Sequence, residues 1–401
     1  MTQRPKELSV GHDEGFEKIE QEQIRADLGE VFRGAVRMSL EMLLEEELQR
    51  LVGAKRYERT VGRRGTRNGS YVRELLTSLG HIRVTVPRAR EGSVASVIGE
   101  YKRRTDEVDD MITEAYVGGV SQRKMEDVTH ALMGKRVSRA AASRVAKRLG
   151  QTVEELRTTK LEGRYAYLYL DATFIDARWA RRVENVATLV AYGVNEDGFR
   201  ELLGVHIGAQ ESEASWSELL ELLVDRGLTG VRLVISDEHA GLKAAARKWF
   251  PEADHQRCTV HLTRNVTKDV PRRLQKRVAR EVSNIFDAET KVAAVERLEE
   301  FEARWGKELP EAVECLRRGF ENAARFFDYP PAHWKRIRTT NSLERLHLEI
   351  KRRTKAVGVF PDRDSALRLV AGVAIRVCAR WGDRRYLDMS LLNDKENQQA
   401  A

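Results

Sequence analysis

The sequence of 401 residues is poor in cysteine, and it has no long apolar run. Its three cysteines, Cys258, Cys315 and Cys378, are an odd and sparse set, which predicts reduced thiols rather than a disulfide framework. The longest apolar run, Val186–Val194, is far shorter than the roughly 20 residues that a membrane-spanning helix needs. The first 30 residues are polar and acidic, so we expect no signal peptide. These absences predict a cytoplasmic protein with no membrane partner.

Basic residues outnumber acidic residues, and they are concentrated in blocks. The net charge is +8 and the isoelectric point is about 9.3. Residues 1–50 are acidic overall, whereas residues 51–90 and 334–355 have a large excess of Lys and Arg. Evenly spread charge would indicate only a solvated surface, but basic blocks favour a nucleic-acid partner. In the second block we expect three residues to contact DNA: Lys351, Arg352 and Arg353.

The first 106 residues are expected to serve assembly and DNA contact. Residues 16–52 place apolar side chains between acids and predict a packing or assembly helix. From Leu51 to Asn68 the chain is basic and rich in glycine, which predicts a loop whose Arg63 and Arg64 contact phosphates. Residues 79–87 alternate in polarity and predict a short strand ended by Pro87.

Residues 107–160 are predicted to form a helix-turn-helix DNA-binding domain. Ser121 is expected to cap a first helix, Gly134 to end it and Ser138 to cap a second helix. The apolar positions of the two helices are Met125, Val128, Leu132, Ala141, Val145 and Leu149. In such a pair the second helix enters the major groove, and we expect it to contact DNA through Arg139, Arg144 and Lys147. An ordinary helical hairpin with a basic, solvated face would show the same pattern.

From residue 161 onward the pattern becomes that of an α/β domain. Three strands with short connections are expected at 164–171, 186–194 and 201–207, which indicates an antiparallel meander. A helix at 213–225 precedes a strand at 231–237, and such a crossover predicts parallel pairing. A helix at 239–249, a strand near 255–258 and a helical block at 260–327 follow. We therefore expect a core segment (161–262), an α-helical insertion (263–332), closing helices (333–385) and a disordered tail (386–401).

Two aspartates end predicted strands, and one glutamate begins a basic helix. Asp171 and Asp237 follow apolar strands expected to be neighbours, although each alone is often only a turn former or a helix cap. Glu344 lies three residues after Asn341, which is the spacing of a capping box. If the three carboxylates converge, they can hold two Mg²⁺ ions for phosphoryl transfer, because Mg²⁺ prefers hard oxygen ligands. An acid in a basic helix is then explained, since metal would bridge Glu344 to phosphate.

Several motifs together resemble the Mutator-type (DDE) transposases of bacterial insertion sequences. The second aspartate lies in VISDEHAGLKAAA (234–246), followed by QRCTVHLTRN (256–265). The glutamate lies in TTNSLE (339–344), followed by KRRT (351–354) and GVFP (358–361). Upstream, YLYLD (167–171) and YVGGVS (116–121) resemble the corresponding segments. Each fragment alone is weak, but the combination is specific and extends over roughly residues 40–385.

The resemblance implies an RNase H-like catalytic domain with an α-helical insertion, preceded by a mainly helical DNA-binding region. Asp171, Asp237 and Glu344 would be its catalytic and metal-binding triad. The triad would bind two Mg²⁺ ions, for which Mn²⁺ could substitute. The implied reaction is cleavage at the terminal inverted repeats of an insertion sequence, followed by attack of the 3′-OH on target DNA. The partner would be double-stranded DNA in the nucleoid, and a homodimer is expected because two ends must be paired.

Other interpretations stay open at this point. Another RNase H-like endonuclease would share the carboxylates but lack end-specific binding, and a DNA-binding regulator or inactive remnant would not need all three. Asp176 is a nearby rival to Asp171, and Glu238 and Ala240 replace residues more usual beside the second aspartate of the family.

Cys258 and His261 form a Cys-x-x-His pair. A structural zinc site normally needs four ligands, and no second pair with suitable spacing follows, so we do not expect zinc. The resemblance includes this pair as a structural motif near the catalytic core, which favours a packing or hydrogen-bonding role.

Overall fold

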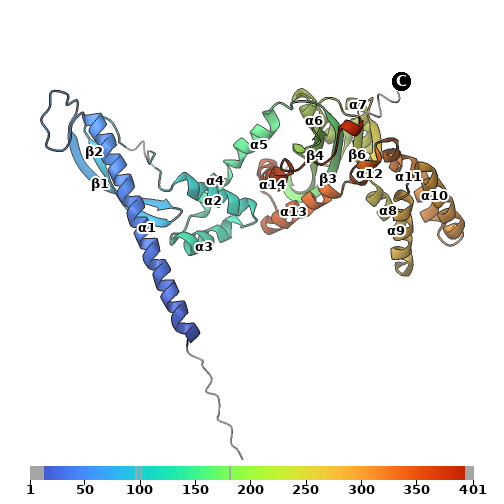
Figure 1. The fold of residues 1–401 in the computed structure, drawn as a ribbon, viewed down its shortest axis with the longest axis horizontal. Coiled ribbons are helices and arrows are strands. Elements are labelled where there is room, and N and C mark those ends of the chain that lie inside the picture. Colours follow the sequence, from blue (N-terminus) through green and yellow to red (C-terminus); the bar gives the residue numbers. More distant parts are fainter. Residues whose placement is uncertain (1–12, 95–97, 100–101, 180–181, 393–401) are drawn as a thin grey trace, which may run out of the picture. The chain divides into compact units, whose positions relative to one another are not determined.

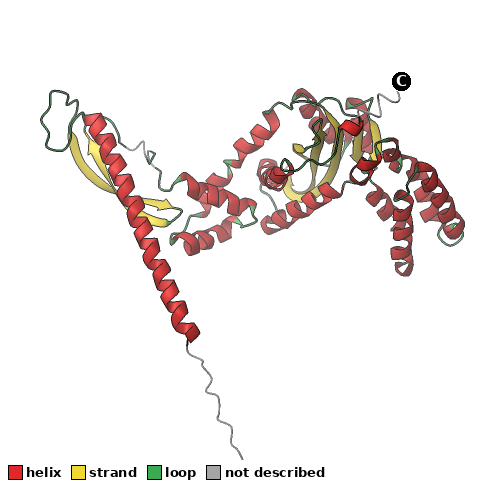
Figure 2. Ribbon diagram, viewed as in Figure 1, coloured by secondary structure: helices red, strands yellow, loops and turns green. Residues whose placement is uncertain are grey.

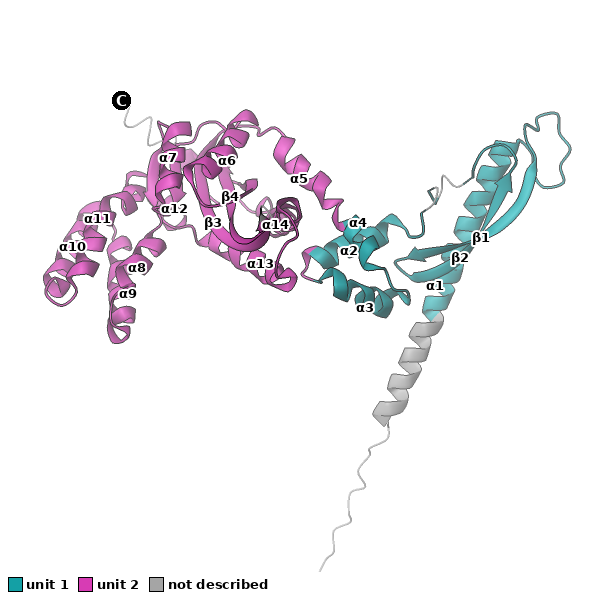
Figure 3. Cartoon of the chain, turned by 180° about the vertical axis from the view of Figure 1, so that it is seen from behind, with its two compact units in different colours: residues 1–116, 120–145 teal, residues 117–119, 146–401 magenta. Residues whose placement is uncertain are grey.

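The computed structural model describes residues 13–94, 98–99, 102–179 and 182–392 (Figure 1). These residues form two compact units (Figure 3). The first unit comprises residues 1–116 and 120–145, and the second comprises residues 117–119 and 146–401. Of the expected tail, residues 393–401 lie outside the described residues. No described helix is both long enough and apolar enough to cross a membrane.

In the first unit a long helix packs against a two-stranded hairpin. Helix α1 (Asp13–Val52) lies where a helix was predicted, and strands β1 (Arg67–Thr77) and β2 (Gly80–Ala89) are antiparallel. Their shared core is made of apolar side chains from both elements, chiefly Leu44, Leu48, Val52, Leu75, Ile82, Val84 and Val86. Other apolar side chains of α1 are at least half exposed, among them Leu28, Val31, Phe32, Met38 and Met42.

The hairpin differs from the prediction in two ways. Strand β1 was missed, because its start at Arg67 lies in a basic, glycine-containing segment that indicates a loop. Strand β2 continues to Ala89, so the prediction that Pro87 ends it is wrong. Proline is tolerated here because each strand of a two-stranded sheet has an open edge where no N–H is needed.

Three short helices complete the first unit: α2 (Asp106–Val117), α3 (Gln122–Met133) and α4 (Arg139–Ala146). The predicted signals are confirmed. The Ser121 hydroxyl accepts from the Lys124 amide at 3.3 Å, Gly134 ends α3 with φ of 70°, and the Ser138 hydroxyl accepts from the Ala141 amide at 3.3 Å.

The details of these helices required correction. The buried stripe of α3 is Met125, Thr129 and Met133, whereas Leu132 is 64% exposed. Helix α4 ends at Ala146, so Lys147 lies beyond it and Leu149 begins a separate helix, α5 (Leu149–Thr158). Residues 146–160, assigned from the sequence to the helix-turn-helix domain, belong to the second unit.

The second unit is built on a five-stranded mixed sheet with the order β5-β4-β3-β6-β7. Figure 2 shows its strands in yellow among the red helices of this unit. Strands β3 (Tyr165–Trp179), β4 (Arg182–Asn195) and β5 (Arg200–Gly208) are the predicted antiparallel meander. Strands β6 (Leu233–Ser236) and β7 (Asp254–Arg257) extend the sheet in parallel. The sequence therefore predicts the directions of the meander strands and of β6 correctly, and it predicts β7 without a direction.

One face of this sheet is covered by α6 (Glu213–Asp225) and α7 (Ala240–Trp249). Trp216 of α6 is fully buried there, and truncating such a side chain typically costs ~3–5 kcal/mol. A register shift between Tyr165 and Tyr167 places Tyr165 in this core. Tyr167 and Tyr169 instead make hydrogen bonds to residues of α12 (Pro331–Ile337), whose His333 lies 2.7 Å from the Tyr167 hydroxyl.

The remaining helices form a block between β7 and the end of the unit. Helices α8 (Thr259–Thr267), α9 (Arg272–Phe286), α10 (Lys291–Trp305) and α11 (Pro310–Ala323) fill the predicted helical insertion (Figure 1). Helices α13 (Asn341–Val357) and α14 (Arg363–Cys378) then return to the sheet. The second unit is thus a mixed α/β structure whose long helical insertion separates the sheet from the helix that carries Glu344.

Candidate active site

Strand pairing brings the two predicted aspartates to the same level of the sheet. Strand β3 continues to Trp179, so the prediction that Asp171 ends a strand is wrong. Its parallel partner β6 is shorter: Tyr169 pairs with Ile235, and β6 ends at Ser236. Asp171 lies two residues beyond the last β3–β6 pair, and Asp237 directly follows β6. The two carboxylates are near enough for the charge of Asp237 to raise the pKa of Asp171.

Glu344 reaches this region from the first turn of α13. The predicted stripe of Leu343, Leu346 and Ile350 is fully buried, so it fixes the rotation of the helix. The alternative capping box expected Asn341 to precede the helix, but the helix already begins at Asn341, and the residue before it, Thr340, makes no side-chain cap. Arg264 of α8 instead holds the Glu344 carboxylate with both terminal nitrogens, at 2.7 and 3.1 Å.

The three carboxylates interact electrostatically. Asp171 is only 6% exposed, and burial raises its pKa to about 7, with the charges of Asp237 and Glu344 adding to the rise. His261 opposes this shift as a nearby positive charge. A buried carboxylate beside two others is costly without a cation, so the cluster favours binding of positive charge.

His347 contacts Asp171 from the turn of α13 that follows Glu344. Its Nδ1 lies 3.4 Å from Asp171 Oδ2, and the ring is buried. Burial, together with the charges of Lys351 and His261, lowers the pKa of His347 to about 3. The ring is therefore neutral at physiological pH and orients Asp171 without competing for its charge.

Cys258 and His261 connect the two helices that flank the site. Cys258 is completely buried, and its sulfur accepts from both the amide and the hydroxyl of Thr340, each at 3.4 Å. The neighbouring thiol is the main cause that raises the pKa of His261 to about 9. The imidazole Nε2 lies 3.6 Å from Glu344 Oε1. These contacts join the start of α8 to the start of α13, which supports the predicted packing and hydrogen-bonding role.

Sequence reasoning missed a fourth carboxylate. Glu211 precedes α6; its side chain is 12% exposed and accepts from the Trp216 indole at 3.3 Å. Burial raises its pKa, with the charge of Asp237 as the next cause. His239 lies between the two acids: its backbone N–H donates to Asp237 at 3.1 Å, and its Nδ1 is 3.6 Å from Glu211. The sequence gives no signal for Glu211, which lies in a loop between β5 and α6.

The residues fit a hard divalent cation by their chemistry. The converging donors are carboxylate oxygens, which suit Mg²⁺ and Mn²⁺. Among the described residues, no three His, Cys, Asp or Glu side chains are already close enough together to hold an ion. Glu344 is directed to Arg264, so binding a metal between all three carboxylates requires this ion pair to open.

The predicted DNA-binding residues are divided between the units. Arg63 and Arg64 lie in the exposed loop before β1, and Arg139 and Arg144 are exposed on α4. Three of the predicted DNA-binding residues belong to the second unit and are exposed there: Lys147, Lys351 and Arg352.

Arg353 is an exception to the prediction. It is 9% exposed, forms an ion pair with Glu349 and donates to the Val117 carbonyl at 3.3 Å. It therefore fixes residues 117–119 against α13, and its guanidinium is not available to phosphate.

Comparison with known proteins gives consistent matches over most of the chain. The sequence model of the family described as "Transposase, Mutator family" matches residues 10–383. The transposase for insertion sequence element ISRM5 of Rhizobium meliloti is 36% identical over 364 residues, which cover 90% of this chain and 92% of the relative. The transposase for IS406 of Burkholderia multivorans is 36% identical (86% and 90% covered). The transposase for IS256 in transposon Tn4001 of Staphylococcus aureus is 35% identical (86% and 90% covered).

Proposed function

The chain belongs to the Mutator family of transposases, and from that premise we propose that it is a DDE-type enzyme. It cleaves DNA at the terminal inverted repeats of an insertion sequence and joins the 3′-OH end to target DNA. Asp171, Asp237 and Glu344 would hold two Mg²⁺ ions, or two Mn²⁺ ions instead. The observation that carries this proposal is that Asp237 directly follows β6, the parallel neighbour of the strand that bears Asp171, and that α13, which bears Glu344, contacts Asp171 through His347.

The sheet supports an RNase H-like assignment for the catalytic domain. Three antiparallel strands are followed by two parallel strands, with the first strand of the meander at the centre. The candidate site lies where the central strand extends beyond its parallel neighbour. The helical insertion occupies the interval between the second aspartate and the glutamate, as the family resemblance implies.

Each residue has a distinct chemical task in this proposal. Two metal ions, when bound, would stabilise the attacking and leaving oxygens of an in-line phosphoryl transfer. Asp171 is oriented by neutral His347, and Asp237 by the His239 amide. Arg264, which is 58% exposed, neutralises Glu344 in the metal-free state and would be free to meet DNA phosphate once metal displaces it.

DNA recognition and assembly are assigned to the first unit. Helices α3 and α4, with the Ser121 and Ser138 caps and the Gly134 stop, support a helix-turn-helix. Arg139 and Arg144 on α4 are exposed for duplex DNA. The exposed apolar side chains of α1 support a homodimer, because an unpartnered apolar helix face favours burial against a second copy.

The test uses a labelled duplex that carries the terminal repeat of the encoding element. Wild type and Glu344→Gln are incubated with it in Mg²⁺, Mn²⁺ or EDTA, and cleavage and strand-transfer products are scored. We expect metal-dependent cutting at the repeat boundary, lost in Glu344→Gln while DNA binding persists. The matched control is Glu321→Gln, which removes an exposed carboxylate on α11 and should cut normally.

Each other outcome rejects part of the proposal. If Glu344→Gln still cuts, Glu344 is not a metal ligand, and its role is limited to the ion pair with Arg264. Binding without any cutting by wild type would favour a regulator or an inactive remnant. Cutting without preference for the repeat would favour another RNase H-like endonuclease.

A further inference from the structure

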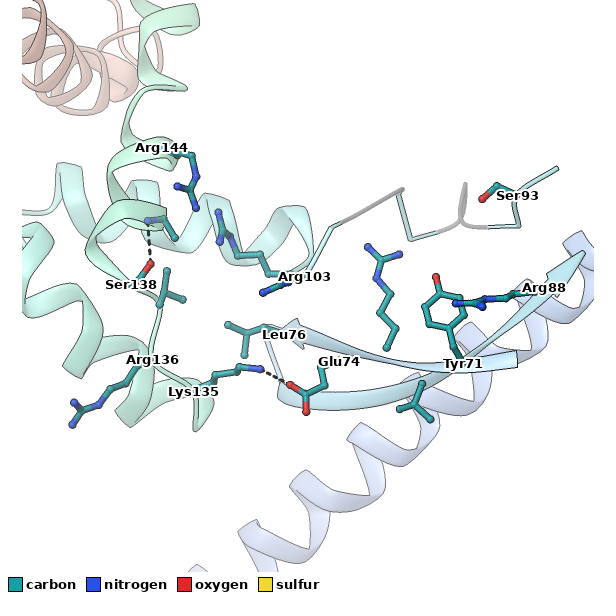
Figure 4. A pocket seen from close by; sticks show the side chains of 15 residues that line it. Tyr71, Glu74, Leu76, Arg88, Ser93, Arg103, Lys135, Arg136, Ser138 and Arg144 are labelled. Atoms are coloured by element: carbon teal, nitrogen blue, oxygen red, sulfur yellow. Dashed lines mark hydrogen bonds and ion pairs between the residues drawn. The ribbon is translucent and has the colours of Figure 1, made fainter. Parts of the chain in front are cut away.

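The first unit contains a cleft of 880 Å³ between the hairpin and the short helices (Figure 4). Strand β1 and part of β2 form one wall of the cleft. Residues 103–104 and the segment from residue 135 into α4 form the other wall. Seven of the fifteen described lining residues are Arg or Lys, and one is acidic. A pocket for a small molecule is mostly apolar with few polar groups, so this lining indicates a polyanion.

The two walls are held together by backbone and side-chain contacts. The Leu76 amide donates to the Arg103 carbonyl at 3.0 Å, and the Thr105 amide donates to the Leu76 carbonyl at 2.9 Å. Leu76 is buried with the α2–α4 core, whereas its neighbour Leu75 is buried with α1. Lys135 donates to Glu74 at 2.9 Å across the cleft (Figure 4). The cleft is therefore a fixed feature of the unit.

Some of the seven cations are neutralised and others are not. Acidic side chains pair with three of them: Arg104, Lys135 and Arg136. Among the described residues, no acidic partner is found for the other four, which are Arg73, Arg88, Arg103 and Arg144. The Arg88 guanidinium lies 4.4 Å from the centre of the Tyr71 ring, which orients it. Figure 4 shows Arg103 and Arg144 on the helical side and Arg88 on the hairpin side.

We propose that this cleft binds the phosphodiester backbone of duplex DNA beside the groove that α4 enters. The proposal rests on the proposed DNA-binding function and extends it to Arg73, Arg88 and Arg103, outside the helix pair. The Ser138 cap and Arg144 line the same cleft, so the start of α4 and the backbone site are continuous. Because these cations meet phosphate rather than base edges, they position the duplex and do not read its sequence.

The experiment measures DNA binding by fluorescence anisotropy over a range of salt concentrations. The duplexes are the terminal repeat and a scrambled sequence of equal length, and the variant is Arg88→Gln with Arg103→Gln. The matched control is Arg37→Gln with Arg50→Gln, which removes the same charge from exposed positions on α1 of the same unit. A third variant, with lysine at both cleft positions, retains the charge.

Each lost phosphate contact lowers the slope of log affinity against log salt by about 0.9. We therefore expect the glutamine double variant to lose about 2 from the slope and on the order of ten-fold in affinity near 0.1 M salt, equally for both duplexes. The lysine variant should regain most of the slope, which a folding defect would not allow. The α1 control should keep the slope of wild type.

Two results for the glutamine variant would overturn the cleft proposal. One is a slope that matches wild type in the glutamine variant. The other is a loss confined to the terminal repeat, which would mean base reading. Wild type is assayed for cutting in parallel: binding without cutting would reject the proposed catalysis and leave the cleft result valid. Wild type that binds neither duplex would reject both.

Discussion

Replacing Asp171 by asparagine should stabilise the metal-free protein at neutral and alkaline pH. Burial raises the pKa of this carboxyl from 3.8 to about 7 in the folded chain. Between these values the folded state holds a proton that the unfolded state has released. The free energy of unfolding of wild type therefore falls as the pH rises through this window. The contribution of Asp171 to stability is least favourable above pH 7.

The magnitude follows from the size of the shift. One pKa unit corresponds to ~1.4 kcal/mol, so the ionised carboxylate costs ~4 kcal/mol at pH 8 and ~1.6 kcal/mol at pH 5. Asparagine has no charge to desolvate and keeps an oxygen for the Ala172 amide, which donates to Asp171 at 3.0 Å. We expect Asp171→Asn to raise Tm at pH 8 by on the order of 10 °C, with a smaller gain at pH 5.

The assay is thermal unfolding in EDTA, followed by circular dichroism at both pH values. Asp176→Asn is the matched control, because Asp176 is exposed on the same strand. Its loss should change Tm little at either pH. Mg²⁺ should raise the Tm of wild type and leave that of Asp171→Asn unchanged. If Asp171→Asn is no more stable than wild type at pH 8, or if its gain is the same at pH 5, the desolvation argument is refuted.

Three further perturbations test the site and the fold. His347→Ala should reduce the cutting rate by roughly 10–100-fold with little change in DNA affinity, because the ring orients a proposed metal ligand; an unchanged rate in a single-turnover assay would contradict this. Arg264→Gln should lower the Mg²⁺ concentration for half-maximal cutting by about five-fold. The exposed ion pair between Arg264 and Glu344 is worth ~1 kcal/mol, and without it Glu344 is free to bind metal. A titration of cutting against Mg²⁺ that shows no shift would rule this out. Gly198→Ala should lower the free energy of unfolding by more than ~2 kcal/mol, because Gly198 has φ of 85° and its added Cβ would lie 1.9 Å from a carbonyl oxygen. The control Gly382→Ala, with φ of −70° and open space around it, should be neutral in urea unfolding.

The local patterns in the sequence determined most of the secondary structure of the second unit and the helix pair α3–α4 of the first. Alternation and turn residues predicted the three-stranded meander, and the crossover predicted the parallel strand β6. Caps placed α3 and α4 correctly, since Ser121 and Gly134 act on neighbouring backbone groups. These features depend on interactions between residues close in the chain, which is why the sequence by itself predicts them.

Tertiary structure decided which residues meet. Asp171 lies within β3, and Asp237 comes near it because the neighbouring strand β6 ends at Ser236; the length of a strand depends on its neighbours in the sheet. Arg264 rather than a helix cap holds Glu344, and helices α9, α10, α11 and α12 lie between the two residues in the chain. Burial of Arg353 against Val117, the approach of Glu211 to Asp237 and the basic cleft beside β1 likewise join distant segments. The sequence determined which chemical groups the protein has, and packing between segments far apart in the chain decided which of them act together.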